Sequence, residues 1–449
     1  MDNQDSISFL ENIFLEEASN EAIIWNDQTY TYRWLYDRVH FFKDLLVEKN
    51  ITKSAVVVLK GDFTPESIAL MLALISHRCI IVPLTKYVKN EEKLLAIASV
   101  EHVFTIDEND SFDFKTIGSF EKNDLYKEIE ARNHPGLVLF SSGTSGEPKC
   151  AVHDFSKLLT KFHVKRKALR TLNFLMFDHW GGLNTMFHIL SNGGVVISTH
   201  VRTPENICWL IEKNRIQLLP ASPTFLNLLL LSEAYTKFDL SSLTMISYGT
   251  EPMLPSTLQK LKSIFPDVRL LQTYGLIELG VLKSKSKSDD SLWVKLGGDG
   301  YELRVVDGLL EIKAESAMLG YLNATSPFTE DGWFKTGDSV LVEGEYFKIL
   351  GRKSELINVG GEKVYPTEIE NVINEMDNVA EVMVYGERNP IIGKMIVAKV
   401  RLSEEEDKKA FIARLKDHCK ARLESFKVPV KVLLDNEVQY GDRLKKTRI

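Results

Sequence analysis

The segment 141–149 constrains this chain most, because it joins an apolar, strand-like run at 136–140 to small and hydroxylated residues that end in a lysine. Glycines let backbone N–H groups approach an anion closely, hydroxyl groups add donors, and a lysine adds a positive charge. A P-loop NTPase needs its lysine directly after the second glycine, whereas Glu147 and Pro148 intervene here. We therefore predict a polyphosphate-binding loop of another kind, formed by Ser141, Ser142, Gly143, Thr144, Ser145, Gly146 and Lys149.

The first 350 residues alternate short β-branched runs with helical patterns, which is typical of a layered α/β architecture. One helix start is clear, because Ser222 can cap it, Pro223 suits its first turn and the apolar run 225–231 follows. The polar run 283–290 predicts a solvated loop. The expected strands lie at 55–59, 79–82, 136–140, 194–197, 217–219 and 244–247.

The character of the chain changes at the short polar break 351–354. Because 449 residues are too many for one core, we predict a large domain over 1–350, a hinge at 351–354 and a small domain over 355–449. Within the small domain, residues 366–370 fit a capping box made by Thr367 and Glu370, and 411–423 has the pattern of an amphipathic helix.

Composition excludes several classes of partner. A formal net charge of −7, with 26% charged and 44% hydrophobic residues, predicts a globular protein without a general attraction to nucleic acid. The most lipid-like run, 68–84, is interrupted by His77 and Arg78, and no secretory pattern is visible, so we expect no membrane span. The four cysteines lie far apart, which suits free thiols in a reducing compartment, and we expect a cytoplasmic protein.

A glycine- and serine-rich loop alone is a weak signal, since an ordinary surface turn has the same composition. Further motifs decide its meaning, and they follow in chain order at 248–252 (Tyr-Gly-Thr-Glu-Pro), 272–278 (Gln-Thr-Tyr-Gly-Leu-Ile-Glu), 332–338 (Gly-Trp-Phe-Lys-Thr-Gly-Asp), 351–352 (Gly-Arg), 360–366 (Gly-Gly-Glu-Lys-Val-Tyr-Pro) and 444–448 (Leu-Lys-Lys-Thr-Arg). With the loop, they resemble the motifs of the adenylate-forming superfamily in that superfamily's order. Its members include acyl- and aryl-CoA synthetases, peptide-synthetase adenylation domains and luciferases.

The resemblance implies a fold and an activity. The fold is a large N-terminal, multi-layer α/β domain followed by a small, mobile α+β domain. The activity is ATP- and Mg²⁺-dependent conversion of a carboxylic acid to acyl-AMP and pyrophosphate, followed by acyl transfer to a thiol, most simply CoA. Such chemistry needs charge neutralisation and in-line positioning, which agrees with the residue types in the motifs.

The resemblance also assigns roles to single residues. The loop 141–149 would hold the β- and γ-phosphates of ATP, and Glu278 would bind Mg²⁺, for which a carboxylate is suited. Tyr274 would stack on adenine. The other wall of the adenine site would be formed by Gly249, Thr250, Glu251 and Pro252.

Two further roles belong to the ribose and to the reacting carboxylate. Asp338 would accept hydrogen bonds from the ribose hydroxyls, and Arg352 would contact ribose or phosphate from the domain junction. Lys445, with Arg448 three residues later, resembles the lysine that bridges the acid and the α-phosphate. Rotation of the small domain would then withdraw Lys445 and let the Gly360–Gly361 loop admit pantetheine. Without the neighbouring motifs, each of these residues would be an ordinary turn, core or surface residue.

Three positions depart from the superfamily's usual pattern. Ile277 stands where a threonine usually contacts the α-phosphate, Ser354 stands at the hinge in place of aspartate or lysine, and Cys150 replaces a glycine. The chain is also shorter than typical relatives between Ile106 and Leu137. These departures leave open a homologue that binds nucleotide or acyl ligand without turnover.

The acid and the acceptor remain open. The segment 174–184 should line the acid site, where Asp178 either pairs with His179 or recognises an amine, and Trp180 and Phe187 are either pocket or core residues. We predict one helix after the phosphate loop whose basic residues either face solvent or meet CoA phosphates or an acidic carrier protein. These residues are Lys157, Lys161, Lys165, Arg166, Lys167 and Arg170. Loading of a carrier-protein phosphopantetheine is therefore the alternative to CoA.

Overall fold

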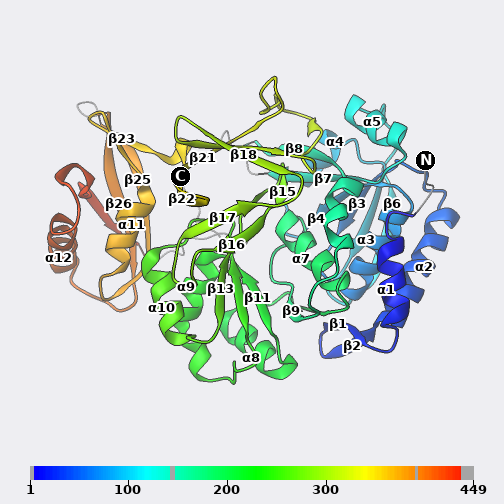
Figure 1. The fold of residues 1–449 in the computed structure, drawn as a ribbon, viewed down its shortest axis with the longest axis horizontal. Helices are drawn as coiled ribbons and strands as arrows, with labels where there is room; N and C mark the ends of the chain where they lie inside the picture. Colours follow the sequence, from blue (N-terminus) through cyan, green and yellow to red (C-terminus); the bar gives the residue numbers. More distant parts are fainter. Residues whose placement is uncertain (1–4, 142–146, 390–392, 436–449) are drawn as a thin grey trace.

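Two seven-stranded sheets form the centre of the large domain in the computed structural model, which describes residues 5–141, 147–389 and 393–435 (Figure 1). The first sheet has the order β20-β8-β7-β4-β3-β5-β6. Its strands are β3 (Val56–Lys60), β4 (Ile80–Leu84), β5 (His102–Ile106), β6 (Phe112–Thr116), β7 (Gly136–Ser141), β8 (Lys149–Asp154) and β20 (Gly320–Tyr321). The helices along this part of the chain are α2 (Tyr32–Glu48), α3 (Pro65–Ser76), α4 (Glu91–Ile97) and α5 (Asp124–Arg132).

The second sheet has the order β13-β12-β11-β9-β10-β1-β2, with parallel pairing from β13 to β1. Its strands are β1 (Glu21–Trp25), β2 (Gln28–Thr31), β9 (Arg170–Leu172), β10 (Val195–Ser198), β11 (Leu218–Ala221), β12 (Met245–Tyr248) and β13 (Arg269–Gln272). The helices that precede or connect them are α1 (Ser8–Glu16), α6 (Phe155–Leu159), α7 (Trp180–Leu190), α8 (Pro204–Asn214), α9 (Pro223–Ser232) and α10 (Pro255–Ile264). The predicted α/β alternation and all six predicted strand positions are confirmed within one or two residues.

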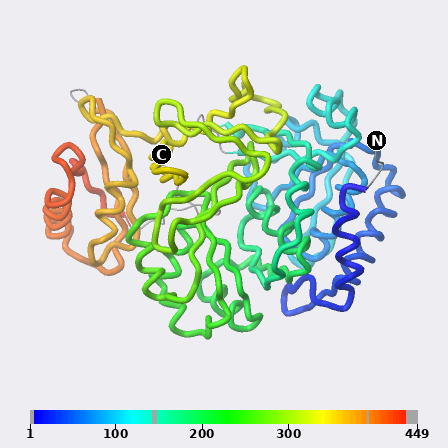
Figure 2. Tube along the Cα trace, viewed as in Figure 1, coloured from blue at the N-terminus to red at the C-terminus, as the bar shows by residue number. Residues whose placement is uncertain are grey.

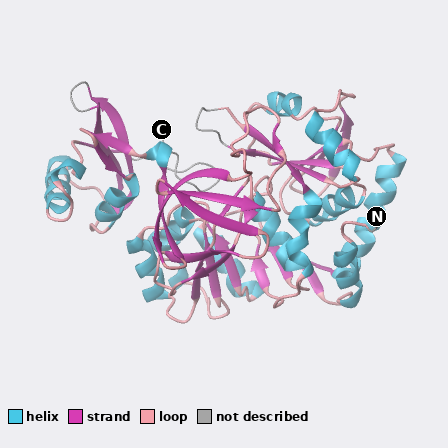
Figure 3. Cartoon of the chain, turned by 45° about the horizontal axis from the view of Figure 1, so that its top comes forward, coloured by secondary structure: helices cyan, strands magenta, loops and turns pink. Residues whose placement is uncertain are grey.

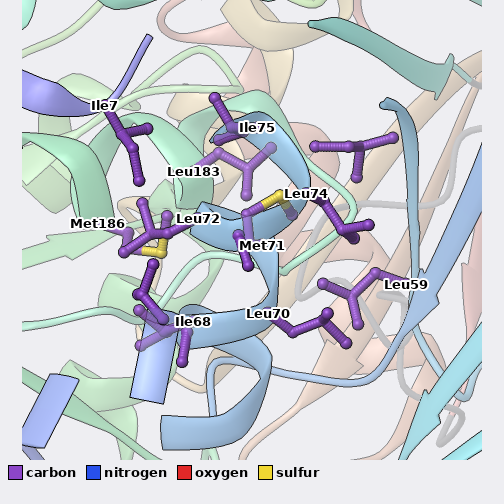
Figure 4. Close-up of a cluster of buried hydrophobic side chains, with 14 of the residues drawn as sticks. Ile7, Leu59, Ile68, Leu70, Met71, Leu72, Leu74, Ile75, Leu183 and Met186 are labelled. Atoms are coloured by element: carbon purple, nitrogen blue, oxygen red, sulfur yellow. The ribbon is translucent and has the colours of Figure 1, made fainter. Parts of the chain in front are cut away.

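The main core lies around α3 and α7 (Figure 4). Residues 68–75 of α3 are all buried, so this helix is apolar on every side and lies among other elements. Leu183 and Met186 of α7 belong to the same cluster. The most lipid-like run of the sequence is therefore a core helix followed by a buried strand. Among the described residues, no helix is both long and apolar enough to cross a membrane.

A six-stranded antiparallel sheet, β16-β17-β22-β21-β19-β18, and the small hairpin β14–β15 complete the large domain (Figure 3). The strands are β14 (Gly275–Leu276), β15 (Gly280–Val281), β16 (Lys283–Ser286), β17 (Trp293–Gly297), β18 (Tyr301–Val306), β19 (Leu309–Ala314), β21 (Phe334–Glu343) and β22 (Tyr346–Arg352). The prediction of a solvated loop over 283–290 was wrong at 283–286, where lysine and serine alternate with the period of a strand, and it is confirmed at 287–290, which form a bend and a turn. Lys283 and Lys285 face solvent, while the Ser286 hydroxyl accepts a hydrogen bond from the Gln272 N–H at 3.0 Å.

The small domain has its own sheet and core, drawn orange to red in Figure 2. Its strands are β23 (Ile357–Val359), β24 (Glu362–Val364), β25 (Val379–Asn389), β26 (Gly393–Leu402) and β27 (Lys431–Leu434), and its helices are α11 (Pro366–Asn374) and α12 (Lys408–Lys420). The predicted helix at 411–423 is confirmed as α12. The capping box was wrong, because both of its side chains bond elsewhere: the Thr367 hydroxyl to the Leu350 carbonyl, and the Glu370 carboxylate to the Val384 N–H.

The small domain contacts the large one along α9 and α10 (Figure 1). The Asn227 amide donates to the Ala380 carbonyl at 3.2 Å, and the Ser256 N–H donates to the Asn371 side chain at 3.2 Å. Asn374 also donates to the Ser256 hydroxyl at 3.2 Å. An interface made of a few polar contacts lets a domain change its position more easily than a broad apolar interface does.

Candidate active site

The ends of the predicted phosphate loop lie opposite each other on the β7–β8 hairpin. Ser141 pairs with Lys149 in antiparallel register, so the strands fix where the loop starts and ends. Asn323 bonds the second strand at its start, accepting from the Cys150 N–H at 2.9 Å and donating to the Pro148 carbonyl at 2.8 Å. Ser142, Gly143, Thr144, Ser145 and Gly146 lie outside the described residues, and their predicted role stays a prediction.

Tyr321 connects this hairpin to Glu278. It lies in β20, which pairs with β8 so that Tyr321 is opposite Ala151. The Lys149 ammonium lies 5.3 Å from the centroid of the Tyr321 ring, and the Tyr321 hydroxyl donates to Glu278 Oε1 at 2.6 Å. Burial and the Glu278 charge raise the pKa of Tyr321, so the phenol stays protonated and donates. Tyr321 was not among the predicted site residues, since no local pattern in the sequence marks it.

Glu278 stands in the connection between β14 and β15. Its carbonyl accepts from the Met318 N–H at 2.8 Å, which fixes the backbone beside β20. Ile277, which departs from the superfamily's pattern, packs against the core clusters on both sides of this connection. The missing threonine hydroxyl is thus replaced by an apolar contact that supports the Glu278 connection.

Asp338 supplies the second carboxylate of the candidate site, after Glu278. It is buried at 6% exposure, and it accepts from the Tyr274 hydroxyl at 2.6 Å. Its strand neighbour Arg352 lies opposite it in the β21–β22 register, with Nε 3.5 Å from Asp338 Oδ1. Burial raises the pKa of Asp338, and the nearby charges of Glu355 and Glu278 add to that increase, while Tyr274 and Arg352 oppose it.

The turn after β12 lies against the residue that follows β13. A Cβ atom on Gly249 would stand 2.5 Å from Thr273 Oγ1 and 2.6 Å from the Thr273 carbonyl oxygen, so only glycine allows this approach. Thr250 has a φ of +71°, and Glu251 accepts from the Thr224 hydroxyl at 2.6 Å at the start of α9. Pro252 follows directly, and Tyr274 follows Thr273, so the two predicted adenine walls lie on neighbouring strand ends.

The structure therefore brings together Ser141, Lys149, Glu278, Asp338 and Arg352, with Tyr274 and the 249–252 turn beside them. Lys445 and Arg448 lie outside the described residues. The stacking role of Tyr274 stays a prediction, and the contact that the structure does show is its hydroxyl on Asp338.

The residues present fit a magnesium ion that is shared with a nucleotide. Mg²⁺ prefers oxygen ligands, keeps several waters and is commonly held by one or two carboxylates and substrate phosphates. Tyr321 engages one oxygen of Glu278. Within the described ranges, no group of three or more His, Cys, Asp or Glu residues could hold a metal ion by itself.

Comparison with known proteins places this geometry in a family. Residues 15–322 match the family described as AMP-binding enzyme, and residues 368–448 match the AMP-binding enzyme C-terminal domain. The chain belongs to the AMP-binding enzyme family. This is the adenylate-forming superfamily that the motifs predicted, and the predicted class of activity, an AMP-forming, ATP-dependent acid–thiol ligase, is confirmed.

Named relatives agree with this class. A 2-succinylbenzoate–CoA ligase of Listeria innocua is 26% identical over 441 residues and covers 92% of both chains. An indoleacetate–CoA ligase of Aromatoleum aromaticum is 30% identical, but the match covers only 59% of this chain and 57% of that one. The crystal structure of an anthranilate CoA ligase with bound anthranoyl-AMP has the same fold, with a TM-score of 0.82, 19% identity and coverage of 99% and 95%.

The segment predicted to line the acid site of this AMP-binding enzyme starts α7. His179 caps the helix, because its Nδ1 accepts from the Gly181 N–H at 3.0 Å. A Cβ atom on Gly182 would lie 2.3 Å from the Met176 carbonyl oxygen, so this glycine permits close backbone packing. Trp180 and Phe187 are both buried and pack against Phe155, which assigns them to the core.

The prediction of one basic helix after the phosphate loop was wrong. Helix α6 ends at Leu159, a 3-10 turn, η1 (Thr160–His163), follows, and Arg170 already belongs to β9. The charges also point to different partners. Lys161 bonds α7 and β15, whereas Arg170 bonds Glu21 and the Asn214 carbonyl, so these residues do not share one face.

Two buried histidines are expected to make the fold sensitive to acid. Burial lowers the pKa of both His153 and His188 to about 4, from an ordinary value near 6.5. The folded state therefore binds fewer protons than the unfolded state between these values, so stability is fully present above pH 6.5 and falls toward pH 4. By pH 5 we expect each histidine to cost about 2 kcal/mol of unfolding free energy.

Urea unfolding at pH 7.5 and pH 5 measures this effect. A His188→Gln variant should lose less stability between the two pH values than the wild type. Exposed His200 provides the control, and a His200→Gln variant should behave as the wild type does. An equal pH dependence in all three proteins would contradict the assignment.

Proposed function

We propose that this chain binds ATP and a carboxylic acid, forms acyl-AMP with release of pyrophosphate, and passes the acyl group to CoA. A carboxylate oxygen attacks the α-phosphorus as pyrophosphate leaves, and the CoA thiolate then attacks the acyl carbon as AMP leaves. The observation that carries the proposal is that Glu278 and Asp338, each bonded by a tyrosine hydroxyl, lie close enough for the Glu278 charge to raise the pKa of Asp338, while Tyr321 joins Glu278 to Lys149 of the β7–β8 hairpin.

Different residues would bind different parts of the nucleotide. Lys149 and the loop from Ser141 would hold the β- and γ-phosphates, while Asp338, supported by Tyr274, would accept hydrogen bonds from ribose. Arg352, which is about half exposed and stands beside Asp338, would bind ribose or phosphate. Tyr274 and the 249–252 turn would enclose adenine. A magnesium ion bound at Glu278 would supply neutralisation of phosphate charge.

The two half-reactions would alternate by motion of the small domain about a hinge at 351–354, between the proposed domains 1–350 and 355–449. Lys445 would neutralise charge between the acid and the α-phosphate only in the first half-reaction. The Gly360–Gly361 turn, where both glycines have positive φ and no atom stands within 4 Å of an added Cβ, would admit pantetheine in the second.

Relatives named as CoA ligases support CoA as the acceptor. The carrier-protein alternative loses support, because the basic residues after the phosphate loop do not form one helical face. We further propose that the protein acts in the cytoplasm, in line with its four free, buried cysteines among the described residues.

Exchange of labelled pyrophosphate into ATP tests the proposal. The assay contains no thiol and offers pooled fatty, aromatic, hydroxy and amino acids and dicarboxylic acids. Exchange that depends on one pool establishes adenylation and its acid class, and exchange with amino acids would assign Asp178 to the amine. Folded protein that gives no exchange with any pool would favour the homologue that binds without turnover.

A further inference from the structure

A lysine beside the candidate active site points inward rather than to solvent. Lys161 lies in η1, and its ammonium donates to Asn184 Oδ1 at 2.7 Å and to the Val281 carbonyl at 2.9 Å. Both acceptors are neutral. Burial and then the Arg166 charge lower the pKa of Lys161 to about 8, which indicates that its positive charge lacks compensation.

The Arg166 guanidinium and the neutral imidazole of His188 lie near Lys161. His188 is one turn beyond Asn184 on α7, and the pKa of His188 is lowered by burial and by the charges of Arg166 and Lys161. The Arg166 backbone N–H donates to the Asn192 side chain, whose amide donates to the His188 carbonyl at 2.6 Å. The exposed Arg166 side chain is close enough for its charge to lower the pKa values of Lys161 and His188. Over the described ranges, no carboxylate forms a salt bridge with Lys161, Arg166 or His188.

The cluster of Lys161, Arg166 and His188 lies against the β14–β15 hairpin of the candidate active site. Val281, which Lys161 bonds, pairs with Gly275 across the β14–β15 hairpin, and Glu278 stands in the connection between those strands. Asn184 belongs to α7, whose first turn begins beside His179. The cluster therefore adjoins α7, which begins in the segment predicted to line the acid site, and the hairpin that carries Glu278.

A partly buried positive charge with only neutral partners is costly, and an anion would offset that cost. The reacting carboxylate has to lie with the nucleotide, on the side of Glu278 and Asp338. We propose that the acid activated by this chain carries a second carboxylate, which is bound by Lys161 with Arg166 and His188. This inference rests on the proposed adenylation and adds the substrate class, a dicarboxylic acid.

Pairs of acids that differ only in the second carboxylate test whether its charge is recognised. Pyrophosphate exchange is measured with adipate and with terephthalate, each against its monomethyl ester, which has the same chain and one carboxylate fewer. We expect kcat/KM for one diacid to exceed that of its half-ester by about tenfold or more, since a hydrogen bond to a charged group contributes about 1.5–3 kcal/mol. The absence of thiol separates this effect from binding of CoA phosphates, which would alter only the thioester step.

Variants then assign the preference to the cluster. Lys161→Gln should reduce exchange with the diacid about tenfold and leave the half-ester within about twofold. Arg166→Gln, at a position exposed to solvent, should lower the same preference, and the neighbouring exposed Lys165→Gln is the control.

Three results would overturn the inference: a half-ester used as well as its diacid, exchange only with monocarboxylic acids, or a preference unchanged in both Lys161→Gln and Arg166→Gln. Exchange with none of the acids, including the wider pools, would instead count against the proposed adenylation.

Discussion

Lys445→Ala should lower carboxylate-dependent pyrophosphate exchange by at least about a hundredfold, because a preorganised charge that meets the developing negative charge of the transition state is removed. Thioester formation from supplied acyl-AMP and CoA should stay within about threefold of wild type, since the proposed domain motion would withdraw Lys445 in that half-reaction. Both rates are measured on the same preparation, with AMP release as the readout of the second step.

The neighbouring lysine supplies the control for Lys445. Lys446→Ala removes the same charge one position along the chain and should leave both half-reactions close to wild type. Equal losses of both half-reactions in Lys445→Ala would contradict the assignment, because they would indicate a folding or docking defect of the small domain. Normal exchange in that variant would contradict it as well.

Local patterns in the sequence predicted the strands and helix ends that neighbouring residues determine. The β-branched runs became strands of the two large sheets, and Ser222 caps α9 by accepting from the Phe225 N–H at 3.1 Å, as its position before Pro223 indicated. The prediction failed where a side chain has a distant partner. Thr367 and Glu370 match a capping box in sequence, yet each bonds a strand of a different sheet.

The candidate site shows the same division. Motifs predicted Glu278 and Asp338, because their neighbours in sequence are distinctive. Tyr321 could not be found in this way, since its importance comes from the pairing of β20 with β8, which puts a distant segment beside the phosphate loop. Likewise, the Lys161 side chain points into the protein because α7 and β15 supply its hydrogen-bond acceptors. The sequence around residue 161 does not include these acceptors, so no local pattern could predict this orientation.

Glu278→Gln should lower pyrophosphate exchange about a hundredfold and raise the Mg²⁺ concentration needed for half-maximal rate. The amide oxygen of glutamine can still accept from Tyr321, so the variant removes charge and keeps the local hydrogen bond. Tyr321→Phe does the reverse, because it removes the 2.6 Å hydrogen bond and leaves the carboxylate charged. We expect this second variant to lose about tenfold, as one hydrogen bond to a charged group contributes about 1.5–3 kcal/mol. Urea unfolding of both variants checks that the fold is kept.

The double variant decides whether Tyr321 acts through Glu278. If the hydroxyl serves only to orient the carboxylate, its loss costs nothing further once the carboxylate is gone, and the double variant should match Glu278→Gln. If the two free-energy losses add, Tyr321 contacts ATP or the acid independently of Glu278, and the positioning role is wrong. The apparent Mg²⁺ dependence gives a second test, because a positioning residue should shift it in the presence of Glu278 and leave it unchanged in the Glu278→Gln background.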